Sequence, residues 1–243
     1  MTGKVALVGA GPGDPKLITV RAVELLQTAQ VVIMDRLISK DLLAYCRVDV
    51  KIIDAGKEPY KHQMTQDEIN AYIIEYAKKG LFVLRLKGGD PYVFGRGFEE
   101  VLACQEAGIE VEVVPGVTSA ISVPASIGIP ITHRGVTQQF SVVSGHVLPS
   151  DPRSMVDWKA LSKSRGTIVL LMAVTNIQQI AQELIKHGLC EKTPVVSIES
   201  AMSPTQRVIY GDLGSIGVIS KEQNISPPAI FVIGEVVGLA DKL

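Results

Sequence analysis

The sequence has little cysteine, and the few cysteines present are not paired. They occur singly at positions 46, 104 and 190, without Cys-x-x-Cys spacing. Isolated cysteines provide neither a disulfide framework nor a zinc site, so we expect a reducing compartment, the cytoplasm. The four histidines are dispersed without the spacing of metal ligands, and we predict no bound metal.

Long apolar runs and an excess of one charge are also missing. The longest apolar run, "TIVLLMAV" at 167–174, is far shorter than the roughly 20 residues of a membrane-spanning helix. The amino-terminal "MTGKVALV" ends at a glycine loop, which indicates a buried strand rather than a signal peptide. A net charge of −1 gives no global basic field for nucleic acid. We therefore expect a soluble protein without membrane or nucleic-acid partners, in which a local cluster of cations must meet any polyanionic ligand.

Hydrophobic residues make up 47% of the 243 residues, enough for a substantial core. Short β-branched segments alternate with helical patterns, which is typical of an α/β protein with a mostly parallel sheet. Strands are expected at 5–8, 31–34, 50–53, 81–86 and 111–114, and helices at 20–29, 66–79 and 97–107. Thr65 and Glu68 have the spacing of a capping box, and Gly80 and Gly108 occupy positions suited to helix C-terminal caps.

A second series of strands is expected at 140–144, 167–172, 194–198 and 230–233. The segment 115–135, which lies between the two series, is rich in proline, glycine and small residues. We place a boundary there and predict two α/β domains, residues 1–115 and 116–243.

Glycines or charged residues follow four of the expected strands. "GAGPGDP" follows Val8, Asp35-Arg36 follows Met34, "KGGDP" follows Leu86 and "PGVTS" follows Val114. Open parallel sheets bind ligands outside the carboxyl ends of their strands. The pattern predicts one ligand site formed by these four strand ends.

The stretch "VALVGAGPGDP" (5–15) is similar to a dinucleotide fingerprint but departs from it at two positions. Pro12 removes a backbone amide where a pyrophosphate would bind, and position 14 is Asp instead of the third glycine. A nucleoside without a pyrophosphate fits this loop better than NAD does. A simple tight turn is the alternative interpretation.

The stretch "RLKGGDPYVFGRG" (85–97) combines flexible backbone with cations. Its two adjacent glycines allow a ligand to approach the backbone, and Asp90 can accept hydrogen bonds from hydroxyls or an ammonium. A type I or II turn with Asp90 as a local cap is the alternative. Arg85, Lys87 and Arg96 favour a binding role, because a bare turn does not require them.

Two further residues are candidates for proton transfer. Asp35 ends an apolar strand, where partial desolvation would make its carboxylate more basic; a ribose contact or a solvated ion pair is the alternative. Lys57 follows a strand and a glycine, and would need burial or a neighbour to donate a proton. Met172, at the end of an apolar strand, is expected in the core. Signatures of covalent catalysis are missing, so the motifs indicate binding and positioning with one or two acid–base groups.

Taken together, these stretches resemble the tetrapyrrole methylases, a class of S-adenosylmethionine-dependent enzymes with two α/β domains. The resemblance covers nearly the whole chain and is strongest to members that act on uroporphyrinogen III. It depends on "VGAGPGDP" (8–15), "DRL" (35–37), "GK" (56–57), "RLKGGDPYVFGRG" (85–97), "VPGVTSA" (114–120), "GIPITHRG" (128–135), "LLMAV" (170–174) and "QRVIYG" (206–211).

The resemblance implies a mostly parallel amino-terminal sheet, a mixed carboxy-terminal sheet and an active-site cleft between the domains. It assigns proton transfer to Asp35 and Lys57, and substrate binding to Arg96, Glu99 and Arg134. It assigns the cofactor contacts to Pro12, Gly88, Gly89, Asp90, Val93, Thr118, Ser119, Met172 and Ala201. Two positions depart from the family pattern: Phe98 stands where a glycine is usual, and Ser119 adds a hydroxyl near the expected cofactor.

The implied reaction is C-methylation of uroporphyrinogen III at C2 and C7, giving precorrin-2 through precorrin-1 and releasing S-adenosylhomocysteine. The product would serve sirohaem or cobalamin biosynthesis, and a homodimer is expected. Because the chain begins at the first motif strand, we expect no fused dehydrogenase–chelatase domain. Two alternatives stay open: a relative that methylates a later precorrin, rRNA or diphthine, and a non-catalytic or NAD-binding nucleotide module.

Overall fold

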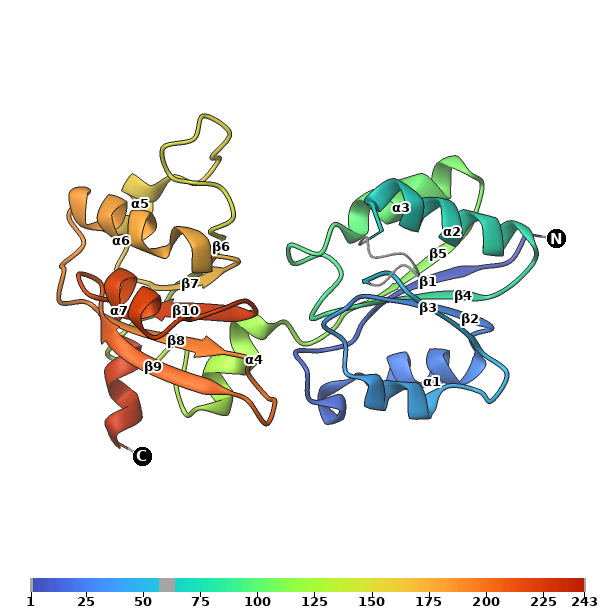
Figure 1. Ribbon diagram of the computed structural model, residues 1–243, viewed down its shortest axis with the longest axis horizontal. Coiled ribbons are helices and arrows are strands. Elements are labelled where there is room, and N and C mark those ends of the chain that lie inside the picture. The colour runs from blue at the N-terminus through green and yellow to red at the C-terminus, as the bar shows by residue number, and fades with distance from the viewer. Residues whose placement is uncertain (1, 57–63, 243) are drawn as a thin grey trace. The chain divides into compact units, whose positions relative to one another are not determined.

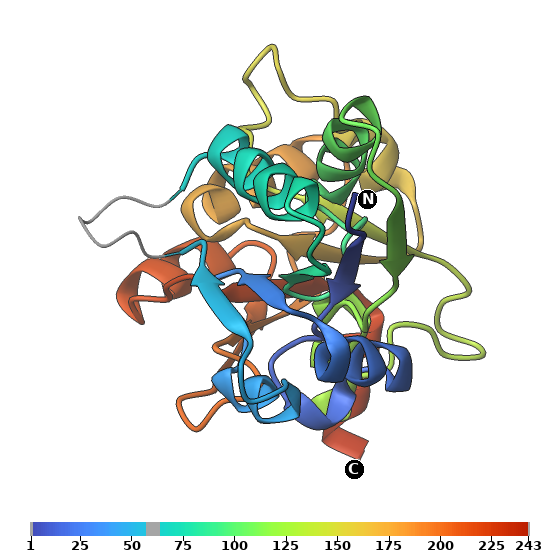
Figure 2. The same ribbon diagram turned by 90° about the vertical axis from the view of Figure 1, so that its right-hand side faces the viewer.

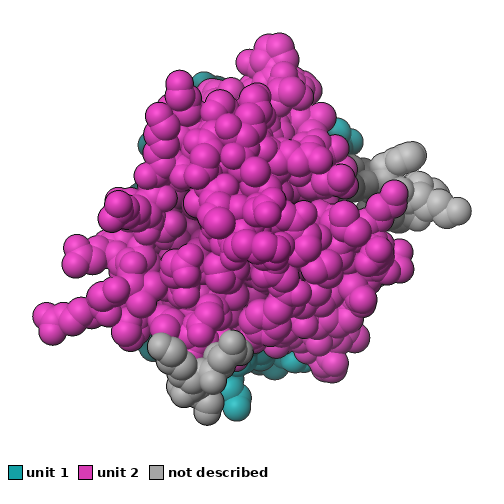
Figure 3. Space-filling model, turned by 90° about the vertical axis from the view of Figure 1, so that its left-hand side faces the viewer, with its two compact units in different colours: residues 1–119 teal, residues 120–243 magenta. Residues whose placement is uncertain are grey.

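The computed structural model describes residues 2–56 and 64–242. The chain divides into two compact units, residues 1–119 and 120–243, which are coloured separately in Figure 3. The boundary expected from the sequence, after residue 115, lies four residues before this division. Each unit contains its own five-stranded sheet and its own hydrophobic clusters.

The sheet of the first unit is entirely parallel, where the sequence predicts a mostly parallel sheet. Its strands are β1 (Val5–Gly9), β2 (Val31–Met34), β3 (Lys51–Asp54), β4 (Val83–Lys87) and β5 (Val111–Val114), in the order β3-β2-β4-β1-β5. The four strands that precede glycines or charges are neighbours in this order. Since all run in the same direction, their carboxyl ends meet at one edge of the sheet.

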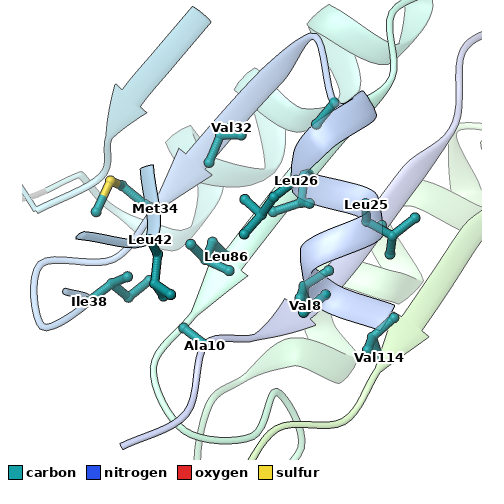
Figure 4. Packing of buried hydrophobic residues seen from close by; sticks show 14 of the residues in the cluster. Val8, Ala10, Leu25, Leu26, Val32, Met34, Ile38, Leu42, Leu86 and Val114 are labelled. Carbon is teal, nitrogen blue, oxygen red and sulfur yellow. The ribbon is translucent and has the colours of Figure 1, made fainter. Parts of the chain in front are cut away.

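Helices cover both faces of this sheet (Figures 1 and 2). On one face lie α1 (Val20–Thr28) and the short helix η2 (Lys40–Tyr45); on the other lie α2 (Gln66–Lys78) and α3 (Gly97–Glu106). Figure 4 shows the α1 side, where Leu25 and Leu26 pack with Val8, Val32 and Leu86 of three neighbouring strands. Burying each such side chain contributes about 1.5–3 kcal/mol.

Helix ends follow the local sequence signals. Thr65 and Glu68 form the predicted capping box, in which each side chain accepts a hydrogen bond from the other residue's backbone amide. Gly80 and Gly108 have φ of 82° and 71°, the left-handed conformation expected just after a helix. The two predicted C-terminal caps are therefore confirmed.

The second unit contains the mixed sheet that the family resemblance implies. Its strands are β6 (Phe140–Ser144), β7 (Thr167–Leu171), β8 (Pro194–Glu199), β9 (Arg207–Asp212) and β10 (Ala229–Ile233), in the order β6-β7-β10-β8-β9. β6 and β7 are parallel, whereas β10 runs antiparallel to β7 and β8, and β9 runs antiparallel to β8. The carboxyl ends of β7 and β8 consequently lie at the same edge.

Two hydrophobic clusters lie on opposite faces of this second sheet. One includes residues of α5 (Trp158–Lys163), α6 (Ile177–Lys186) and α7 (Ile216–Glu222). The other includes residues of α4 (Ser119–Ser126) and of the terminal 3-10 segment η4 (Glu235–Lys242). Among the described residues, no helix is long and apolar enough to cross a membrane.

Candidate functional site

The glycine loops after β1, β4 and β5 pack directly against one another. Gly11 and Gly89 exchange two backbone hydrogen bonds, with N–O distances of 3.2 and 2.8 Å. A β-carbon on Gly9 would lie 2.5 Å from the α-carbon of Gly116, and one on Gly116 would lie 2.1 Å from the Gly89 carbonyl oxygen. Close packing of the protein's own backbone therefore explains Gly9 and Gly116, whereas Gly11 and Gly89 have φ of 80° and 64°, a conformation that favours glycine.

Gly88 is different, because nothing in the described part of the protein explains its lack of a side chain. A β-carbon there would meet no heavy atom within 4 Å, and Gly88 is not among the glycines with positive φ. The space beside it is open, and Gly88 is the first residue after β4, at the predicted ligand edge. This is the feature expected where a ligand approaches the backbone closely.

Asp90 joins two of these loops. Its Oδ1 accepts a hydrogen bond from the Tyr92 amide at 2.8 Å, and its Oδ2 accepts one from the Gly116 amide at 3.0 Å. The structure thus gives Asp90 a loop-joining role in addition to the ligand contact expected from the sequence. Each carboxylate oxygen has a second lone pair, so the two roles are compatible.

The other cofactor candidates of the first unit lie in the same loops. A β-carbon on Gly89 would lie 3.8 Å from the α-carbon of Thr118 and 4.0 Å from the amide nitrogen of Ser119. Pro12 is half-buried in the bend after Gly11, and Val93 is half-buried in the loop after Asp90. The strand-edge topology therefore places these candidates on neighbouring loops of one unit.

Arg85 and Lys87 do not face a ligand, and this corrects the interpretation of "RLKGGDPYVFGRG". They point to the same face of β4, as residues two apart in a strand do, and are only 1% and 3% exposed. Their partner is Glu100 of α3, whose side chain is 0% exposed. Glu100 Oε1 accepts hydrogen bonds from Arg85 Nε at 3.0 Å, Lys87 Nζ at 2.9 Å and Gln66 Nε2 at 3.1 Å.

Burial has an electrostatic cost for this cluster. Burial lowers the pKa of the Lys87 ammonium, and the neighbouring Arg85 charge lowers that pKa further. The negative charges of Glu100 and Asp35 act in the opposite direction and raise it. Sequence reasoning missed Glu100. The available signal was the presence of two cations on a buried strand, which require a buried counter-ion.

Asp35 is the accessible end of the same cluster. Its Oδ1 forms an ion pair with Arg85 Nη2, and its side chain is 35% exposed. Its backbone amide donates a hydrogen bond to the Leu86 carbonyl at 3.2 Å, which fixes the start of the loop beside β4. Lys57, the second predicted acid–base residue, lies outside the described residues.

Arg96 and Glu99, the predicted substrate-binding pair of the first unit, form an exposed, two-pronged ion pair. Arg96 Nε and Nη2 donate to the two carboxylate oxygens of Glu99 at 2.9 and 2.7 Å, and the guanidinium holds the pKa of Glu99 below its ordinary value. An exposed pair of this kind contributes little stability, so the Arg96 fork can exchange Glu99 for another carboxylate.

The loop that carries Arg96 is strained. Phe94 and Arg96 have φ of 54° and 56°, a left-handed conformation that is uncommon for residues other than glycine. Each such residue costs on the order of 1–3 kcal/mol, and strain of this kind gathers at functional sites. Phe98, the departure from the family pattern, is exposed and packs edge-to-face on Tyr92 with 6.1 Å between ring centroids.

Met172 and Ala201, the cofactor candidates of the second unit, follow β7 and β8 at the same edge of their sheet. Leu171 and Ile198, near the ends of these strands, are both register partners of Ile230 in β10. Met172 has φ of 55° and is 49% exposed, so the core position expected from its apolar strand is wrong. Its conformation and exposure are those of a residue presented to a partner or ligand.

Arg134 is exposed in a tight turn of the second unit. The turn is closed by reciprocal backbone hydrogen bonds between His133 and Thr137, with N–O distances of 3.1 and 3.0 Å. Among the described residues of both units, no group of three or more His, Cys, Asp or Glu side chains could hold a metal ion.

Comparison with known proteins identifies the family. The sequence profile of the tetrapyrrole (corrin/porphyrin) methylases matches residues 4–217. A uroporphyrinogen-III C-methyltransferase of Methanocaldococcus jannaschii is 48% identical over 243 residues, covering all of both chains. A siroheme synthase of Hahella chejuensis is 45% identical over 242 residues, covering 100% of this chain and 51% of the longer relative. The crystal structure of uroporphyrin-III C-methyl transferase from Thermus thermophilus complexed with S-adenyl homocysteine has 40% identity and a TM-score of 0.81, covering 98% of this chain and 100% of that one. The chain belongs to the tetrapyrrole methylase family.

Proposed function

We propose that this protein transfers methyl groups from S-adenosylmethionine to uroporphyrinogen III. Methylation at C2 and C7 gives precorrin-2 through precorrin-1, for sirohaem or cobalamin biosynthesis. The observation that supports this substrate most strongly is the identity of 48%, over the full length of both chains, to a uroporphyrinogen-III C-methyltransferase. The family resemblance of the motifs points to the same reaction.

The glycine loops of the first unit suit S-adenosylmethionine. Open space beside Gly88 allows the ligand to approach the backbone, and the free lone pairs of Asp90 can accept its hydroxyl or ammonium hydrogens. We assign further contacts to Pro12 and Val93, and to Gly89, Thr118, Ser119, Met172 and Ala201. S-adenosylmethionine supplies an electrophilic methyl group, and S-adenosylhomocysteine is released after each transfer.

Exposed arginines suit the acidic substrate. Uroporphyrinogen III carries carboxylates around its ring, and the planar fork of arginine binds a carboxylate through two parallel hydrogen bonds. We assign this role to Arg96 and Arg134, both exposed, with Glu99 holding the Arg96 fork in position until substrate binds. Arg85 and Lys87 are excluded from direct contact by their burial.

The chemical step requires alignment and one proton acceptor. An electron pair of the pyrrole carbon forms the new carbon–carbon bond while the methyl–sulfur bond breaks, and the sulfur keeps the bonding pair. The methylated ring then loses a proton. Asp35 is the acceptor we assign, because its carboxylate is accessible at the ligand edge and held by Arg85. We assign the donor role to Lys57. Homodimer assembly and a cytoplasmic location stay predictions.

A substrate panel with a labelled methyl donor tests this proposal. Uroporphyrinogen III should accept the label under anaerobic conditions, whereas a later precorrin, rRNA and diphthine-precursor protein should not. Preferential labelling of any of these three would replace the assigned substrate. A thermal-shift comparison separates the cofactor classes: S-adenosylhomocysteine should raise the Tm and NAD should not.

A further inference from the structure

The buried ion cluster of Asp35, Arg85, Lys87 and Glu100 needs an explanation beyond stability. Removing charges from water costs several kcal/mol per ion, and replacing buried ion pairs by apolar residues is often neutral or stabilising. The cluster lies between β4 and α3, where apolar side chains otherwise fill the core. Lys87 immediately precedes the glycine loop after β4, and Asp35 follows β2 at the same edge of the sheet, which suggests a role at the ligand edge.

Glu100 fixes the orientation of Arg85. All three nitrogens of the guanidinium are engaged: Nε donates to Glu100 at 3.0 Å, and Nη1 donates to the carbonyls of Ile33 and Leu86 at 3.4 and 3.2 Å. The third nitrogen, Nη2, donates to Asp35. The guanidinium therefore cannot rotate without losing buried hydrogen bonds.

Glu100 also balances charge. One of its oxygens accepts all three donors, while Oε2 has no hydrogen-bond partner among the described residues. With every group ionised, the two cations and two carboxylates sum to zero. Asp35 is the one member that is substantially exposed, with 35% of its side chain accessible against 3% or less for the other three. The cluster thus has a single outlet to solvent at the strand edge.

We propose that Glu100 is a positioning residue that acts on Asp35 through Arg85. By holding the guanidinium and offsetting the Lys87 charge, Glu100 keeps Asp35 in one orientation and lets it act as a base. This inference rests on the proposed role of Asp35 as proton acceptor. It extends the site into α3, to a residue that itself touches neither substrate nor cofactor.

Removing the charge of Glu100 and removing the charge of Arg85 should have opposite effects on the basicity of the Asp35 carboxylate. Asp35 is paired with Arg85 of β4, and ion pairs link Arg85 through Glu100 of α3 to Lys87 of β4. Removing the Glu100 charge leaves excess positive charge, which makes the Asp35 carboxylate a weaker base. Removing the Arg85 charge leaves excess negative charge, which opposes ionisation of Asp35. A purely structural role would not produce shifts of opposite sign.

The test measures the titration of Asp35 by carbon-detected NMR in Glu100→Gln and Arg85→Gln variants. The midpoint should move to lower pH in Glu100→Gln and to higher pH in Arg85→Gln. Glu106→Gln makes the same chemical change at an exposed position of α3 and should leave the midpoint unchanged. The double variant Lys87→Met/Glu100→Gln restores neutrality and should return the midpoint toward its original value, which also covers the case in which Glu100→Gln alone does not fold.

The pH dependence of methyl transfer links this titration to function. The acid limb of the single-turnover rate should move in the same direction as the NMR midpoint in each variant, while S-adenosylhomocysteine affinity stays within about twofold of the unmodified protein. The inference would be overturned if the NMR midpoints were equal in all variants or shifted with the same sign. It would also be overturned if the acid limb of the rate did not move with the NMR midpoint. If the unmodified protein does not methylate uroporphyrinogen III, the proposed function fails, and the NMR result still decides whether Glu100 acts on Asp35.

Discussion

Gly116 lies so close to Gly89 that a β-carbon on Gly116 would stand 2.1 Å from the Gly89 carbonyl oxygen. Gly88, the residue before Gly89, faces open space instead. Gly116 and Gly88, in one cluster of loops, thus lack a side chain for different physical reasons. Gly116 is required by packing within the protein, whereas the space beside Gly88 is open, as the proposed cofactor contact requires.

Alanine substitutions at Gly116 and Gly88 test these two explanations separately. Gly116→Ala should lower the free energy of unfolding by about 1–3 kcal/mol, because backbone atoms must shift to admit the methyl group. Gly88→Ala should change it by less than about 0.5 kcal/mol but weaken S-adenosylhomocysteine binding by about tenfold or more. Urea unfolding and calorimetric titration measure the two effects. Unchanged affinity in Gly88→Ala would remove this glycine from the proposed cofactor site.

Asp90→Ala should lower both the free energy of unfolding and the affinity for S-adenosylhomocysteine. The Gly116 and Tyr92 amides lose their acceptor, and the loops after β4 and β5 lose the hydrogen bond that Asp90 makes between them. We expect a loss of about 1–3 kcal/mol in the free energy of unfolding together with weaker S-adenosylhomocysteine binding. Calorimetry on the folded fraction measures the second effect. Retention of full affinity would confine Asp90 to its loop-joining role.

Arg96→Ala should damage turnover far more than cofactor binding. Only an exposed ion pair with Glu99 is lost from the protein itself, so stability should be nearly unchanged. The KM for uroporphyrinogen III should rise about tenfold or more, because a two-pronged carboxylate contact disappears. Arg47→Ala removes a similar exposed pair, with Asp49, and is the matched control. Equal losses of substrate and cofactor affinity would contradict the assignment.

Asp35→Asn should slow methylation by at least about a hundredfold while leaving the fold intact. Arg85 Nε still donates to Glu100 in this variant, so the buried guanidinium keeps one ionic contact. Single-turnover kinetics with saturating cofactor, beside circular dichroism, separate rate from folding. A full rate would exclude Asp35 as the proton acceptor.

The buried Lys87 makes stability depend on pH with a defined sign. Burial first, and the Arg85 charge second, lower its pKa from the ordinary value of 10.5. Between the lowered and the ordinary pKa, the unfolded chain binds more protons than the folded protein, so the contribution of Lys87 to the free energy of unfolding rises with pH. This rise should be missing in Lys87→Met and present in Lys78→Met, a control on the exposed side of α2. Urea unfolding at a series of alkaline pH values measures it, and parallel curves for Lys87→Met and the unmodified protein would contradict the prediction.

Buried parallel strands were the part of the fold that the sequence predicted best. β2 and β5 match their expected ranges, β1 ends one residue later than expected, and β4 begins two residues later and ends one residue later. Continuous apolar runs are typical of parallel strands covered on both faces. β9 was not predicted as a strand. It lies at the edge of the mixed sheet with a half-exposed pattern, so its apolar signal is weak.

The helices of the second unit were missed although one carried a clear signal. Ile177, Ile180, Ala181 and Leu184 of α6 are all buried and have the spacing of one helix face. In the candidate site, the sequence predicted which loops meet, since the ends of parallel strands share an edge. It could not predict which cations point inward, because the orientation of Arg85 and Lys87 depends on Glu100, a residue supplied by another element.

The product of the reaction with uroporphyrinogen III tests the central claim most directly. The protein is incubated anaerobically with uroporphyrinogen III and S-adenosylmethionine, and the macrocycle is analysed by mass spectrometry. We predict a product heavier by two methyl groups, with two S-adenosylhomocysteine molecules formed for each macrocycle converted. A macrocycle of unchanged mass would contradict the proposed function.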